Sequence, residues 1–209
     1  GSGKRSGGKP SYSYICYDFD SYSDASYAAW TLSKEFTRLL MEKFNLDTHN
    51  GWGLVPAGLV NHDRELWDVK LEAIQNLNLD GKVGFQVDVA AGTFYEKDKD
   101  RYVGIFSAEE KTRDDMMRLY EEMVTNYPFV IIEDPLDEND YEGHAELTRR
   151  LGIEIVTSAA GVGFQITERF VFGRERLEQQ REHGMLEDVG KIAGVVEMAV
   201  VHEGPVADC

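Results

Sequence analysis

The sequence predicts an α/β fold in which parallel strands alternate with crossover helices. Apolar runs of strand length occupy 83–89, 129–133 and 153–157, and segments with helical spacing occupy 109–125 and 141–151. Each helix returns the chain to the end at which the preceding strand began, so this order makes the three strands parallel. The 209 residues fall short of the about 250 of a closed eight-stranded (β/α) barrel, so we expect an incomplete barrel.

The amino-terminal part of the sequence predicts a tail, a strand and a long helix. Residues 1–10 contain glycine, serine and basic residues without large apolar side chains, so we expect a flexible tail or an expression remnant. Residues 11–20 alternate bulky apolar with small polar side chains, as a strand does. A Ser-Asp pair then offers an N-cap to a helix over 25–44. We expect residues 11–209 to form one domain.

The remaining segments are predicted from turn residues and apolar spacing. Glycine and proline punctuate 50–61, which predicts a loop, and 63–77 has the apolar spacing of a helix. An acidic loop is expected at 96–101. Beyond residue 157 the pattern weakens: 168–183 is highly charged and indicates a helix, whereas 195–201 is apolar and fits either a helix or a strand.

Charge and composition exclude several classes of partner. A formal net charge of −16 and a pI near 4.7 argue against nucleic acid and anionic membranes. No apolar stretch approaches the about 20 residues of a transmembrane helix. The two cysteines, Cys16 and Cys209, do not make a disulfide framework, so we expect a reducing, cytoplasmic compartment.

Two strands of the predicted sheet end in acidic residues. Asp88 lies where the strand 83–89 gives way to small residues, and Glu133 and Asp134 directly follow the apolar run 129–132. Carboxylates at the carboxyl ends of buried parallel strands are where (β/α) barrels keep metal ligands and catalytic groups. We therefore expect Asp88 and Glu133 to converge at one end of the sheet. The alternative role for each is to cap a helix or to pair with a lysine.

These strands and their flanks resemble enolase, the phosphopyruvate hydratase family. Residues 87–95 (VDVAAGTFY) are similar to the family pattern LDVAASEFY, and residues 127–144 are similar to YPIVSIEDPLDEDDWEGW. The likeness is clear over about 62–156. It implies an incomplete (β/α) barrel of the enolase superfamily without the amino-terminal capping domain. It also implies Mg²⁺-dependent dehydration of 2-phosphoglycerate to phosphoenolpyruvate.

The resemblance supplies two of the three carboxylates that hold Mg²⁺ in the family. Asp88 matches the first ligand and Glu133 matches the second. The third is expected at the next strand end, where the family reads IVGDDLF and this chain has Ser158 and Ala159 in place of both aspartates. We therefore expect Mg²⁺ binding to be weak, or absent if Ser158 truly replaces the third ligand.

The resemblance assigns no catalytic residue. The lysine that removes the proton in the family aligns with Asp188, and Lys191 lies three residues later, where a surface lysine is expected. Of the two family glutamates, one aligns with the acid-free loop at 50–53 and the other with Ser11. The phosphate-binding residues of the family are expected beyond Cys209.

Two functions from different classes follow. The first is an enolase that is inactive as this isolated chain, and the second is a non-catalytic pseudo-enolase acting as a structural or assembly subunit. Five or six strands leave two open sheet edges, which favour association. We expect a partner protein, a second copy of the chain or the segment 168–201 to cover them.

Overall fold

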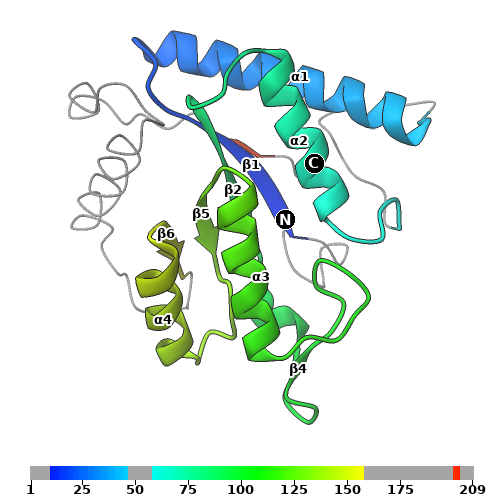
Figure 1. The fold of residues 1–209 in the computed structure, drawn as a ribbon, viewed down its shortest axis with the longest axis vertical. Helices are drawn as coiled ribbons and strands as arrows, with labels where there is room; N and C mark the ends of the chain where they lie inside the picture. The colour runs from blue at the N-terminus through cyan, green and yellow to red at the C-terminus, as the bar shows by residue number, and fades with distance from the viewer. Residues whose placement is uncertain (1–9, 47–57, 158–199, 203–209) are drawn as a thin grey trace, which may run out of the picture.

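The computed structural model describes residues 10–46, 58–157 and 200–202, the last of these as backbone only (Figure 1). The amino-terminal part contains strand β1 (Ser11–Cys16) and helices α1 (Tyr22–Phe44) and α2 (Arg64–Asn76). The central part contains, in order, β2 (Val83–Asp88), the 3-10 helix η2 (Ala91–Phe94), β3 (Tyr95–Glu96), β4 (Arg101–Tyr102) and α3 (Arg113–Asn126). It is followed by β5 (Phe129–Glu133), α4 (Tyr141–Leu151), β6 (Glu154–Val156) and β7 (Val200–His202). Within these residues no helix is long and apolar enough to cross a bilayer.

The main sheet contains five strands in the order β6-β5-β2-β1-β7. β2, β5 and β6 are parallel neighbours, as the strand and helix order predicts. Their last residues are in register, because Asp88 pairs with Glu133 and Glu133 pairs with Val156. Across the described ranges the sheet is open, so these strands do not close a barrel.

β1 departs from the parallel arrangement of the other strands. It pairs antiparallel with β2 along its whole length, from Ser11 opposite Asp88 to Cys16 opposite Val83. Two helices, α1 and α2, separate these strands and pack against each other. A single crossover helix would return the chain to the end of the sheet where β1 starts. The second helix runs back along the sheet again, so β2 starts at the end where β1 stops.

The carboxyl-terminal strand β7 lies at the outer side of β1. It pairs antiparallel with Ser13–Ile15 of β1. The apolar segment predicted at 195–201 as a helix or a strand is therefore a strand where the structure describes it. β7 lies beside β1 and becomes the edge strand on that side of the described sheet.

Two helices begin at other residues than the sequence pattern predicts, because the caps lie elsewhere. α1 begins at Tyr22, since Ser21 has an extended backbone and its hydroxyl accepts the Asp24 N–H at 3.1 Å. α3 begins at Arg113, where Thr112 and Asp115 form a reciprocal capping box. Lys111, which precedes the capping residue Thr112, forms backbone hydrogen bonds with Tyr102 instead of entering the helix.

The core lies between one face of the sheet and the helices. Alternation along β2 directs Val83, Phe85 and Val87 to this face, where all three are almost fully buried. Figure 1 shows α2 and α3 on the viewer's side of the sheet. Gln86 and Asp88 have the opposite parity and are half-buried on the other face. The candidate ligands thus lie away from the helical layer, at the carboxyl end of the strands.

Several predictions lie outside the described residues. These are the tail before Pro10, the loop around residues 50–57, the third-ligand position Ser158 and the helix expected at 168–183.

Candidate functional site

Two acids that end neighbouring strands meet at the carboxyl end of the sheet. Asp88 is the last residue of β2, Glu133 is the last residue of β5, and the two are paired across the parallel strands. One carboxylate oxygen from each, together with one from Asp134, lies within 4.8 Å of the others. The prediction that Asp88 and Glu133 converge is confirmed. Their role as metal ligands stays a prediction.

Asp134 joins this group because the chain leaves the strand at that residue. In a regular strand, consecutive side chains point to opposite faces, so Asp134 would point away from Glu133. Its φ of 46° instead places it in the left-handed region, which aspartate tolerates better than most residues. The sequence shows the adjacent acid pair, but strand alternation gave no reason to assign both to one site.

Gln86 supports the orientation of Glu133. Its side-chain amide donates a hydrogen bond to the Glu133 carboxylate at 3.3 Å. Gln86 lies two residues before Asp88 on β2 and therefore on the same face. This two-residue spacing is the sequence signal that identifies Gln86 as a neighbour of the acids, and it was missed. A polar group that fixes a ligand side chain in this way is typical of metal sites.

Glu133 lies close to two other negative charges. Burial, followed by the negative charges of Asp88 and Asp134, raises the pKa of Glu133, and the Gln86 hydrogen bond opposes this in part. The site therefore disfavours the charged form of Glu133. A cation bound at Glu133 would oppose this effect and favour its charged form.

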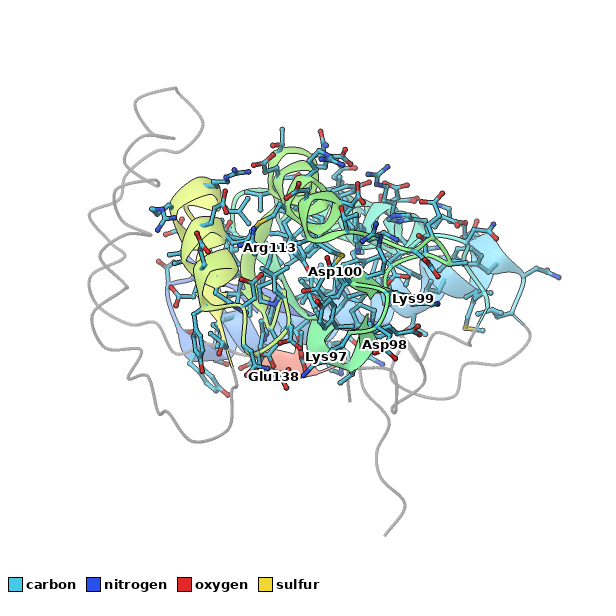
Figure 2. The ribbon with its side chains drawn as sticks, turned by 90° about the horizontal axis from the view of Figure 1, so that it is seen from below. Lys97, Asp98, Lys99, Asp100, Arg113 and Glu138 are labelled. Carbon is cyan, nitrogen blue, oxygen red and sulfur yellow. The ribbon has the colours of Figure 1, made fainter. Side chains whose placement is uncertain are left out.

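Loops from β2 and β5 form the rim of this end of the sheet. Figure 2 shows this end from below and labels Lys97–Asp100 and Glu138. Residues 97–100 form the turn between β3 and β4, and Glu138 lies in the loop after β5. Lys99 pairs with Glu96 and Glu110, each at 3.0 Å, and Arg113 pairs with Asp140 at 2.6 Å. These two cations neutralise acids on the rim, not the acids at the strand ends.

Comparison with known proteins places this arrangement in a family. The family described as "Enolase, C-terminal TIM barrel domain" matches residues 26–199. The chain belongs to the enolase family. The recognised segments around Asp88 and Glu133 lie inside the matched region, and the open sheet is therefore an incomplete enolase barrel.

Curated enolases from bacteria and archaea show the extent of the likeness. The chain is 34% identical over 149 residues to the enolase of Corynebacterium kroppenstedtii, covering 70% of this chain and 33% of that protein. It is 31% identical over 169 residues to the enolase of Methanococcus aeolicus, covering 79% of this chain and 37% of that protein. The chain thus spans about a third of the length of the curated enolases that it matches.

The donor set fits the Mg²⁺ ion that enolases normally use. All three groups are carboxylates, and hard cations such as Mg²⁺ prefer oxygen ligands. Neighbouring oxygens around an octahedral Mg²⁺ are about 3.0 Å apart and opposite ones about 4.2 Å, since each Mg–O bond is about 2.1 Å. The three carboxylate oxygens lie within 4.8 Å of one another, so they would have to move closer together to bind the same ion.

The other residues that the enolase resemblance singled out contribute no further acid or base to the described site. Ser11 is paired with Asp88 across β1 and β2, so a serine lies where a family glutamate is expected. Ser158, Asp188 and Lys191 lie outside the described residues. Among those that are described, the three acids are the one group of histidine, cysteine or acidic side chains close enough to hold a metal.

Proposed function

We propose that this chain carries the Mg²⁺-binding part of an enolase barrel, the fold that dehydrates 2-phosphoglycerate to phosphoenolpyruvate, and that it is inactive as an isolated chain. Asp88 and Glu133 act as ligands to the ion. The observation that carries the proposal is the convergence of these two carboxylates at paired strand ends, in a chain of the enolase family.

In this reaction, the described residues would bind and orient the metal ion. When bound, Mg²⁺ would neutralise the substrate carboxylate and the negative charge that develops beside it. Asp88 and Glu133 hold the ion, and Gln86 holds Glu133 in its orientation through the 3.3 Å hydrogen bond. Proton removal next to a carboxylate also needs a positioned base. By the enolase resemblance, the nearest counterpart of that lysine in this chain is Asp188.

We therefore expect the purified 209-residue chain not to dehydrate 2-phosphoglycerate detectably. Loss of one strong electrostatic group lowers a rate by about 10²–10³-fold, and the resemblance aligns Asp188 with the base and Ser158 with the third ligand. The measurement is the absorbance of phosphoenolpyruvate with excess Mg²⁺, with an intact enolase as the positive control. Turnover of about 1 per second, the lower end of the ordinary enzyme range, that disappears in Glu133→Gln would show this chain to be a working enolase.

The alternative is a non-catalytic pseudo-enolase that acts as a structural or assembly subunit. The replaced base and third ligand favour it, and so does the open sheet, which has β6 and β7 at its edges within the described ranges. Open edges favour pairing with another chain. In this alternative, a second copy or another protein covers the β6 edge.

Sedimentation of the purified chain tests for such a partner. We expect a species larger than the 23.6 kDa monomer, or a monomer that shifts to larger species when an intact enolase is added. A monomer that stays monodisperse at all concentrations and with added enolase would exclude both a second copy and this partner.

The cysteine content fits a reducing compartment, and we propose a cytoplasmic location. Cys16 is a free, buried thiol, and burial raises its pKa to about 11. A thiol of this kind is unreactive and needs no disulfide partner.

A further inference from the structure

The outer face of α1 carries exposed aromatic side chains. Among the described residues, four large apolar side chains are at least half exposed, and three of these lie on α1. One side of this helix has an exposed residue at every third or fourth position, and these residues are Asp24, Tyr27, Trp30 and Lys34. Residues at this spacing share one face of a helix. We call these four residues the α1 stripe.

The two rings of the α1 stripe are held in place although they are exposed. Tyr27 and Trp30 stack with their ring centroids 5.8 Å apart, and the Lys34 ammonium lies 4.6 Å from the centroid of the Trp30 ring. The opposite side of α1 is buried and packs against β1 and α2. Tryptophan and tyrosine are frequent anchors of protein interfaces. Rings that are already held in place lose little conformational freedom when a partner covers them.

We propose that the α1 stripe is the contact surface between two copies of this chain, which pair their α1 helices in antiparallel directions around a two-fold axis at Trp30. This interface goes beyond the proposed function and is independent of the proposed Mg²⁺ site. It also differs from the β6 edge, because α1 packs against β1 and β7, at the other end of the strand order.

Charge complementarity selects a second copy in this orientation. A two-fold axis places the same residues opposite each other in reverse order. When Trp30 faces Trp30, Lys34 lies four residues later and faces the position four residues earlier, between Asp24 and Tyr27 of the second copy. Each lysine therefore lies near an acid and a tyrosine ring, both of which attract a cation. A parallel pair would instead place lysine opposite lysine and aspartate opposite aspartate.

Lys34 is better suited to this contact than the next cation of the helix. Arg38 already pairs with Glu35 at 2.8 Å and with Glu42 at 2.7 Å on its own helix. Lys34 contacts the Trp30 ring instead. Its charge can therefore reach a carboxylate of a second copy without breaking an ion pair within the described residues.

The size of the α1 stripe sets the expected strength of the dimer. A fully buried aromatic side chain covers about 150–250 Å². Tyr27 is 67% exposed and Trp30 is 50% exposed, so the two rings leave roughly 250 Å² per copy uncovered. This is well below the about 800 Å² per partner of a standard interface. We therefore expect a reversible dimer with a Kd in the micromolar range.

Sedimentation equilibrium of the purified full chain, at micromolar concentrations in about 0.15 M salt, tests the proposal. At this salt concentration the repulsion between two chains of net charge −16 is screened beyond about 8 Å. The variants are Trp30→Ala, Lys34→Glu, Asp24→Lys and the double variant that carries both charge exchanges. The matched control is Lys97→Glu in the exposed turn between β3 and β4 (Figure 2). Circular dichroism and thermal melting verify that each variant folds.

We expect the wild type to form a dimer and Trp30→Ala to raise its Kd about tenfold or more, because interface tryptophans carry a large share of the binding energy. Lys34→Glu and Asp24→Lys each place like charges opposite each other and should have a similar effect. The double variant restores opposite charges in exchanged positions, so its Kd should return to within about threefold of the wild-type value. Lys97→Glu should leave the Kd within about twofold, because this charge lies outside the contact and is screened.

Four results would overturn the proposal. The first is a wild-type chain that stays monomeric. The second is a wild-type dimer whose Kd is unchanged in Trp30→Ala, because another surface, such as the β6 edge, then holds it. The third is a double variant that dimerises as weakly as Lys34→Glu, which contradicts the antiparallel arrangement. The fourth is a monomer that binds an added intact enolase through the α1 stripe, because the occupant is then another protein.

Titration of Mg²⁺ into the same samples tests the metal site separately. Because Asp24, Trp30 and Lys34 lie on α1 and the candidate ligands end β2 and β5, we expect the variants to bind Mg²⁺ as the wild type does. Failure of the dimer therefore leaves the proposed function unaffected.

Discussion

Glu133→Gln is expected to abolish most of the stabilisation that Mg²⁺ gives the protein. Glutamine keeps the shape of the side chain but removes the charge that attracts the ion. At a Mg²⁺ concentration about 100 times the wild-type Kd, the ion should raise the free energy of unfolding of the wild type by about 2.7 kcal/mol. A variant that binds about 100-fold more weakly gains only about 0.4 kcal/mol. Urea unfolding with and without Mg²⁺ measures both values.

The same experiment without Mg²⁺ separates lost binding from lost folding. Burial and the charges of Asp88 and Asp134 raise the pKa of Glu133, so its charged form is disfavoured in the fold. Above that pKa, the neutral glutamine should therefore leave the metal-free protein at least as stable as the wild type. Glu122→Gln on the exposed surface of α3 is the matched control and should keep the full Mg²⁺ effect. Equal Mg²⁺ stabilisation in Glu133→Gln and the wild type would rule out Glu133 as a ligand.

Trp67→Ala is expected to lower the free energy of unfolding by about 3–5 kcal/mol, the range for removing a large aromatic side chain from a packed core. Trp67 on α2 is fully buried. Its ring contacts those of His62, Phe106, Tyr127 and Phe129 at centroid distances of 5.4–5.8 Å. Because Phe129 begins β5, this cluster joins the helical layer to the strand that carries Glu133. The shift of the urea unfolding midpoint measures the loss.

Trp30→Ala provides the matched control for the aromatic substitution. Trp30 lies on α1 with half of its surface exposed, stacks on Tyr27 and has the Lys34 ammonium 4.6 Å from its ring. Removing these exposed contacts should cost less than about 1 kcal/mol. A loss of similar size for both variants would mean that Trp67 does not anchor the core.

The sequence was sufficient to predict the parallel strands and the meeting of their terminal acids. Buried strands such as β5 are apolar runs, and parallel neighbours bring their carboxyl ends to one edge of the sheet. Asp88 and Glu133 could therefore be placed together before their separation was known. The enolase resemblance added the expectation of Mg²⁺, which no spacing of acids provides by itself.

The sequence could not predict the direction of β1 or the position of Asp134. The first depends on how α1 and α2 pack against each other, which is a tertiary contact between segments far apart in the chain. The second depends on one backbone angle, the φ of 46° at Asp134, which turns the side chain back toward Glu133. Alternation rules apply to regular strands and fail at the residue where a strand ends.

The most direct test of the metal site is the location of a Mn²⁺ ion in crystals of the protein. Mn²⁺ accepts the same octahedral oxygen ligands as Mg²⁺ and scatters anomalously. We predict one anomalous difference peak at the carboxyl end of β2 and β5, within bonding distance of carboxylate oxygens of Asp88 and Glu133. Ordered Asp88 and Glu133 carboxylates with no peak between them, in crystals grown with saturating Mn²⁺, would contradict the assignment of this end of the sheet as a metal site.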